Sequence, residues 1–305
     1  MLLFLAACAT ATTQSAAPPA LREQIWTEHS ATLAHDLTHG PSECLALNRD
    51  PMQRQSIEIG RALFRSPALL GGPAARTGLS CNACHTNGRV NAHFLLPELT
   101  NRAGQADTTS EWASKVRGDG VMNPRPIPDL AGVGEKTTHG HLNDPSLEHF
   151  AHSVMTEEFQ GPEPSPQAFA GVIAYLRALD THTCSLAETP ETLARAADDV
   201  RRALAAAQNT DAPTARLVLY ATQDAVGRVV ERLPARDFAP ERRELENLAR
   251  ELGALRDANA QVLPALKAMA LGWSARFDAV IASIAPRENR TYFNETQVRR
   301  LIASN

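Results

Sequence analysis

The sequence has no excess of charge of either sign and no long apolar segment. Its 305 residues carry a formal net charge of −4, and lysine and arginine are scattered rather than clustered. Nucleic-acid binding needs a basic surface, so bulk charge gives no case for such a partner. No uninterrupted run of 18 apolar residues occurs, and such a run is what predicts a membrane-spanning helix.

Histidine and cysteine are missing from the C-terminal part of the chain. The last histidine is His182, the last cysteine is Cys184, and glycine becomes rare beyond them. Metal ligation in residues 185–305 would therefore depend on carboxylates alone. Apolar residues recur there at helical spacing, in sets that begin at Leu193, Leu219 and Leu245. We predict an antiparallel helical bundle in which the third helix continues through Met269 with a kink at Pro264.

Residues 80–86, SCNACHT, contain the one Cys-x-x-Cys-His pattern of the chain. This pattern is the attachment signature of c-type haem, because two thiols bond to the porphyrin vinyl groups and the adjacent imidazole reaches the iron. A zinc site would need a second ligand pair, and a redox dithiol would need a preceding strand where residues 72–80 are predicted to form a loop. We therefore predict one covalent haem c on Cys81, Cys84 and His85.

Two helices are predicted to cross beside this motif. The first begins with Asp50 as its N-cap and Pro51 at its first position and runs to about Phe64. The second covers residues 167–179 and places Tyr175 on its apolar face. Because glycine allows close helix approach, Gly60 and Phe64 are expected to contact Tyr175.

This arrangement resembles the class I cytochrome c fold, in which two helices cross beside the haem. Residues 60–69 and 79–85 are similar to the opening of a haem domain in the bacterial di-haem cytochrome c peroxidases, and residues 123–133 and 140–150 are similar to its later half. The resemblance covers about half of the chain. It implies a cytochrome c-like haem domain at 21–184, and with the bundle that the apolar spacing predicts at 185–305 the whole chain is expected to be all-α.

The sixth ligand of the iron is expected to be Met155. In the peroxidases the axial methionine follows the helix that begins like Ser-Leu-Glu, and Met155 stands in the matching place. A thioether raises the reduction potential, which suits electron transfer. Pro97 is the predicted carbonyl partner of the other His85 nitrogen. The alternative ligands are Met122, His93, His139, His141, His149 and His152, of which His139 and His141 are predicted to lie in a solvated loop.

The chain departs from the peroxidases in having one haem motif instead of two. Peroxide reduction takes two electrons, so the sequence favours an electron carrier over an enzyme. Two alternatives stay open: a cytochrome c peroxidase-like enzyme whose second haem comes from a partner, and a haem-based sensor whose bundle transmits ligand binding. The expected partner of the carrier is a small cytochrome, a copper protein, an oxidase or a peroxidase.

The N-terminus and the remaining cysteines indicate the bacterial cell envelope. Residues 1–8, MLLFLAAC, resemble the lipobox of lipoprotein signal peptides, which implies that Cys8 carries a lipid anchor, although no basic residue precedes the short apolar run. Residues 9–20 would then be a flexible tether. In an oxidising periplasm, Cys44 and Cys184 are expected to pair as a disulfide, the alternative being two buried free thiols.

Overall fold

The computed structural model describes residues 19–46, 50–180, 187–258 and 262–304. The described chain is 59% helix and 6% strand, which confirms an all-α class. Its elements, in order, are η1 (Arg22–Ile25), α1 (Leu33–Asp36), β1 (His39–Pro41), α2 (Pro51–Phe64), η2 (Pro67–Leu69), α3 (Gly72–Arg76), α4 (Cys81–Cys84), η3 (Thr86–Gly88), β2 (Gln105–Ala106), β3 (Arg125–Pro126), η4 (Val133–Glu135), α5 (Leu147–Ser153), η5 (Val154–Glu158), α6 (Pro166–Ala178), β4 (Glu188–Pro190), α7 (Leu193–Ala207), α8 (Ala212–Glu231), α9 (Ala235–Asp257), α10 (Val262–Ile284), η6 (Ala285–Arg290) and α11 (Glu295–Ala303).

Helices α2 and α6 cross at two glycines, as the sequence predicts. The Asp50 carboxylate caps α2 by accepting from the Met52 amide. A Cβ added to Gly60 would lie 2.0 Å from the carbonyl oxygen of Gly171. The rings of Phe64 and Tyr175 lie 5.0 Å apart at the same crossing. The absence of side chains at the two glycines is therefore what lets the backbones meet.

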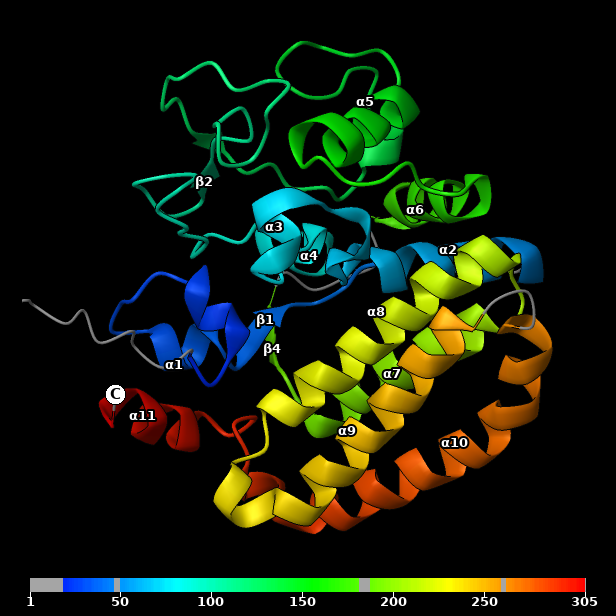
Figure 1. Ribbon diagram of the computed structural model, residues 1–305. Helices are drawn as coiled ribbons and strands as arrows, with labels where there is room; N and C mark the ends of the chain where they lie inside the picture. The colour runs from blue at the N-terminus through cyan, green and yellow to red at the C-terminus, as the bar shows by residue number, and fades with distance from the viewer. Residues whose placement is uncertain (1–18, 47–49, 181–186, 259–261, 305) are drawn as a thin grey trace, which may run out of the picture.

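The C-terminal region forms a bundle of four long helices, α7 to α10, which lie side by side in Figure 1. Consecutive helices are joined by short connections and so run antiparallel. The single kinked helix that we predict through Met269 is wrong, because α9 ends at Asp257 and α10 begins at Val262. Pro264 falls in the first turn of α10, where a missing amide breaks no helical hydrogen bond. Residues 72–76, predicted as loop, form the short helix α3.

The bundle and the preceding helices share one apolar core. Ile59 of α2, Val172 of α6, Val200 of α7 and Val226 of α8 belong to the same buried cluster. The strand β1 pairs antiparallel with β4, with His39 opposite Pro190. Segments on both sides of residue 184 therefore pack against each other over a wide area.

The two ends of the described chain also meet. Figure 1 shows α1 beside α11, far from each other in sequence. A small apolar cluster of Leu21, Leu33, Leu37 and Val298 joins them. The C-terminal helix is therefore held by few buried side chains.

One helical stretch of the described chain, Val262–Arg290, is long and apolar enough to cross a membrane by length and composition alone. Leu266, Trp273 and Phe277 on this stretch are almost fully buried in the bundle. Leu271 on the same stretch is 84% exposed, so the stretch is buried along one face only.

Candidate haem-attachment site

The Cys-x-x-Cys-His motif forms a single helical turn, α4, followed directly by His85. The His85 amide donates to the Cys81 carbonyl over 2.9 Å, which closes the turn. Residues three apart lie on one face of such a turn, so Cys81 and Cys84 share a face, and His85 follows them as the C-cap residue. Both thiols are free.

The His85 ring is held by a backbone carbonyl. Its Nδ1 lies 3.0 Å from the oxygen of Pro128, and a carbonyl can only accept, so Nδ1 carries the proton. No other hydrogen bond to this ring is found among the described residues. Nε2 is therefore left with its lone pair available to a metal.

The predicted carbonyl partner, Pro97, is wrong. Residues 128–130 fold back along the motif instead: the Leu130 amide donates to the Gly88 carbonyl over 3.1 Å, and Arg89 pairs with Asp129 at 2.9 Å. These two contacts hold residues 128–130 against the motif, so the Pro128 carbonyl lies next to the His85 imidazole.

Protein atoms crowd the three motif side chains, although each retains some solvent-accessible area. Burial lowers the pKa of His85 to about 4 and outweighs the hydrogen bond that the ring donates to the Pro128 carbonyl. Burial also raises the pKa of Cys81 to about 11 and raises that of Cys84 further. The imidazole is therefore neutral at pH 7, which is the form that binds iron.

Apolar residues lie on both sides of the motif. Cys81 packs against the main core and Cys84 against a second apolar cluster. That second cluster contains Trp26, Leu70, Ala74, Leu79, Ala83, Phe94, Leu96, Leu99, Ala113, Ile127 and Phe159. Such walls suit a large, mostly apolar ring system.

Met155, the expected distal ligand, lies in an irregular helical turn. It is 3% exposed and belongs to the main core. It falls within η5, a π-helical turn that continues α5 and that the sequence did not predict. Single π-helical turns occur often at functional sites. Val154, its neighbour in the chain, packs against the same cluster as Cys84, so this turn lies between the two apolar groups that border the motif.

The alternative ligands of the iron are either exposed or already bound to a carboxylate, apart from His139. Met122 is 52% exposed, and His141 is exposed. His93 Nδ1 lies 3.4 Å from the carboxylate of Asp36 in α1. His149 and His152 are each bound by a nearby carboxylate, Asp144 and Glu163 respectively.

His139 does not lie in a solvated loop, contrary to the prediction. Its side chain is 6% exposed, and its ring stacks on Phe150 with centroids 6.4 Å apart. The backbones of His139 and Asp144 exchange two hydrogen bonds, which close the loop between them. Its Nδ1 is buried and has no hydrogen-bond partner among the described residues. His139 therefore remains a candidate for binding an added group.

The other cysteines are only partly described. Cys44 is buried and disulfide-bonded. Its predicted partner, Cys184, lies outside the described residues, so the pairing stays a prediction. The predicted lipid acceptor, Cys8, also lies outside them.

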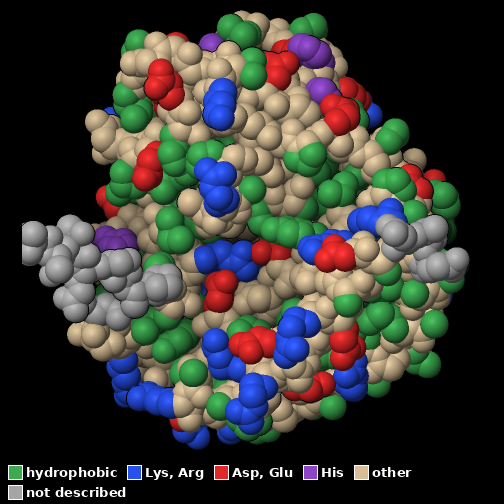
Figure 2. All heavy atoms as spheres, viewed as in Figure 1, with side chains coloured by type: hydrophobic (Ala, Val, Ile, Leu, Met, Phe, Trp, Pro, Cys, Tyr) green, Lys and Arg blue, Asp and Glu red, His purple; other side chains and the backbone are tan. Residues whose placement is uncertain are grey.

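A cleft of about 660 Å³ lies behind the motif, and we call it the charged cleft. The motif turn lines it with Ser80, Asn82 and Asn87 but not with Cys81, Cys84 or His85, so the cleft is separate from the attachment site. Figure 2 shows basic and acidic side chains gathered across the middle of this face, where the bundle meets the rest of the molecule.

A buried ion network in the wall of the charged cleft ties the bundle to the motif. Arg61 of α2 pairs with Glu43 at 2.7 Å and with Asp199 of α7 at 2.6 Å. Arg65 pairs with Glu43 at 2.8 Å and donates to Asn87 over 2.6 Å. Burial alone would raise the pKa of both carboxyls, but the two guanidiniums outweigh it and hold each pKa at about 2. The network therefore spans α7, α2 and the turn after His85.

Sequence reasoning missed this network. The available signal was Arg61 and Arg65, one helical turn apart on an otherwise apolar face of α2.

No protein-family model, curated protein or solved structure was found that matches the chain.

Proposed function

We propose that the protein is a mono-haem c-type cytochrome that transfers electrons in the bacterial cell envelope. The observation that carries the proposal is that Cys81 and Cys84 lie in one helical turn with His85 directly after it, with both thiols free and the His85 Nδ1 proton bound to the Pro128 carbonyl. This arrangement meets the requirements of the attachment chemistry: two thiols at the right spacing and a neutral, oriented imidazole.

The residues would have separate roles. Cys81 and Cys84 tether the group, His85 binds the metal through Nε2, and Met155 supplies the second axial ligand. When bound, a c-type haem supplies a one-electron couple between ferric and ferrous iron. A buried thioether favours the ferrous state and raises the potential, whereas an exposed one such as Met122 would leave the site open to water.

We further propose that residues 21–184 form a cytochrome c-like domain. The glycine crossing of α2 and α6, with the Cys-x-x-Cys-His turn between them in the sequence, supports this assignment. The proposed location is the periplasm or the outer surface of a bacterial membrane, with a lipid on Cys8 and a Cys44–Cys184 disulfide. The proposed electron-transfer partner is a small cytochrome, a copper protein, an oxidase or a peroxidase.

The experiment is spectroscopic analysis of protein produced in a host with a c-type haem assembly system. We expect one covalent haem per chain by pyridine haemochrome analysis, and none in the Cys81→Ala, Cys84→Ala double variant. The oxidised protein should show the methionine-to-iron charge-transfer band, which Met155→Ala should lose and the exposed Met122→Ala should keep.

Two other results would contradict this function. Zero or two haems per chain would refute the mono-haem assignment. High-spin ferric iron that binds cyanide rapidly and turns over peroxide would favour the peroxidase-like enzyme.

A further inference from the structure

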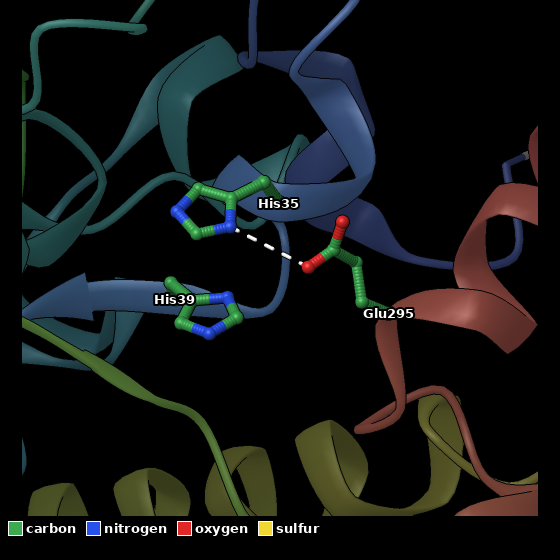
Figure 3. Close-up of side chains that lie close together, drawn as sticks. All are labelled: His35, His39 and Glu295. Carbon is green, nitrogen blue, oxygen red and sulfur yellow. Dashed lines mark hydrogen bonds and ion pairs between the residues drawn. The ribbon is translucent and has the colours of Figure 1, made fainter.

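Two histidines and a glutamate from distant parts of the chain meet beside the C-terminal helix. They are His35 of α1, His39 of β1 and Glu295, the first residue of α11. One ligand atom from each lies within 4.8 Å of the other two, and all three residues are partly buried. Figure 3 shows Glu295 reaching from α11 toward the His35 ring, with the His39 ring beside it.

The contacts within this cluster involve both nitrogens of His35. Its Nδ1 lies 3.5 Å from Glu295 Oε2, and its Nε2 lies 3.1 Å from Glu188 Oε2. The His35 and His39 rings stack with centroids 4.1 Å apart and an angle of 15° between their planes. Two imidazoles and two carboxylates from α1, β1, β4 and α11 thus occupy one small region.

We propose that His35, His39 and Glu295 bind a divalent transition-metal ion of the zinc class, with water as the fourth ligand. Imidazole nitrogens and carboxylate oxygens are the ligands that such ions prefer, at about 2.0–2.2 Å. Ligand atoms around a tetrahedral ion are then roughly 3.5 Å apart. The separations of up to 4.8 Å require a closure of up to about 1.3 Å, which rotation of the partly exposed side chains can supply.

The backbone already holds the ligands in place. The β1–β4 pairing fixes His39 relative to the strand that carries Glu188. The Asn294 side chain caps α11 by accepting from the amides of Thr296 and Gln297, which fixes the first turn and Glu295 with it. Only rotation of side chains is therefore needed to form the site.

A bound ion would clamp the C-terminal helix to the N-terminal segment. The apolar contact there consists of a few residues, chiefly Leu33, Leu37 and Val298. An ion that binds only the folded chain stabilises it by mass action. The proposed role of the site is therefore to secure α11, independently of electron transfer.

The test uses full-length, haem-loaded protein that has no histidine tag and has been treated with a chelator. Titration with ZnCl₂ in a calorimeter should show one ion per chain. His39→Ala and Glu295→Gln should each weaken binding by about 100-fold or more, since loss of an outer partner alone costs roughly 10–100-fold. His29→Ala, an exposed histidine in the same segment, is the matched control and should bind as the original protein does.

Two further readouts separate the clamp from adventitious surface binding. Zinc should slow amide hydrogen exchange across residues 295–303 in the original protein and leave it unchanged in His39→Ala. Cu²⁺, added to the original protein alone, should give an electron paramagnetic resonance spectrum with two coordinated nitrogens, which needs no variant to fold.

The proposal is overturned if zinc shows no saturable binding up to about 1 mM, a level at which a specific site is filled. It is also overturned if His39→Ala binds zinc as tightly as the original protein. The haem absorption spectrum should be the same with and without zinc, so failure here is distinguishable from failure of the electron-transfer function.

Discussion

The glycine crossing of α2 and α6 predicts a large effect from a single methyl group. In Gly60→Ala the new Cβ would lie 2.0 Å from the Gly171 carbonyl oxygen and 2.7 Å from the Tyr175 Cβ. Non-bonded heavy atoms are most stable at about 3.5 Å or more, so the helices must separate by roughly 1.5 Å. The obstructing atoms are backbone atoms of Gly171 and the Cβ of Tyr175, none of which a side-chain rotation can move away.

The magnitude follows from two opposing effects. Overpacking of a close contact costs about 1–3 kcal/mol and more where backbone must shift. Alanine is favoured over glycine in a helix by about 1 kcal/mol, which offsets part of this cost. We expect Gly60→Ala to lower the free energy of unfolding by about 2 kcal/mol, and the thermal midpoint by roughly 3 °C in a chain of this length.

The assay is denaturant and thermal unfolding followed by circular dichroism. Gly272→Ala on α10 is the matched control, because nothing lies within 4 Å of its added Cβ. That variant keeps the propensity gain without the clash, so it should be stabilised by up to about 1 kcal/mol. Equal or greater stability of Gly60→Ala than of the original protein would refute the close crossing.

Three further predictions concern charge and capping. Glu43→Gln leaves the buried guanidinium of Arg65 without its full counter-charge and should lower the free energy of unfolding by about 3–5 kcal/mol. The control, Asp278→Asn, breaks an exposed ion pair and should lower it by less than about 1 kcal/mol. Equal losses of the two variants in urea unfolding would refute the network. Glu43 and Asp199 each have a pKa of about 2 in the folded protein, against ordinary values of 4.5 and 3.8. The stability that they contribute is therefore present above about pH 4.5 and is lost as the pH falls toward 2. Acid unfolding of Glu43→Gln should depend less steeply on pH than that of the original protein. Asn294→Ala removes the N-cap of α11 and should lower the stability of that helix by about 1 kcal/mol. Amide hydrogen exchange in α11 should become faster, and unchanged exchange would contradict the cap.

Local signals predicted much of the fold. The Asp50-Pro51 pair marks the start of α2, and its apolar spacing together with Gly60 indicates the face that meets Tyr175. These features depend on neighbours within a few turns, which the sequence displays directly. Contacts between residues far apart in the chain leave no such local pattern. The sequence therefore predicts the nearby Pro97 as the carbonyl partner of His85, whereas the structure has Pro128, 43 residues away.

Continuous apolar spacing hid one helix boundary. The pattern from Leu245 to Met269 has no glycine or proline at the break between Asp257 and Val262, so periodicity alone merged α9 and α10. Pro264 lies inside this pattern and so predicts a kink, but in the structure it lies in the first turn of α10, where proline is tolerated.

Two features of the candidate sites depend on tertiary contacts alone. His139 is in a polar loop, TTHGHLND, and its burial comes from Phe150 stacking on its ring. The His35, His39 and Glu295 cluster joins segments about 260 residues apart and has no sequence spacing that would indicate it. The sequence shows which residue types are present at both sites, but it does not show that they lie close together in the fold.

Mass spectrometry of the intact mature protein, followed by peptide mapping, tests the central claim most directly. We predict that the chain carries one added haem mass, located on the peptide that contains Cys81 and Cys84. A mature envelope protein with both thiols unmodified and no added haem mass would contradict the account.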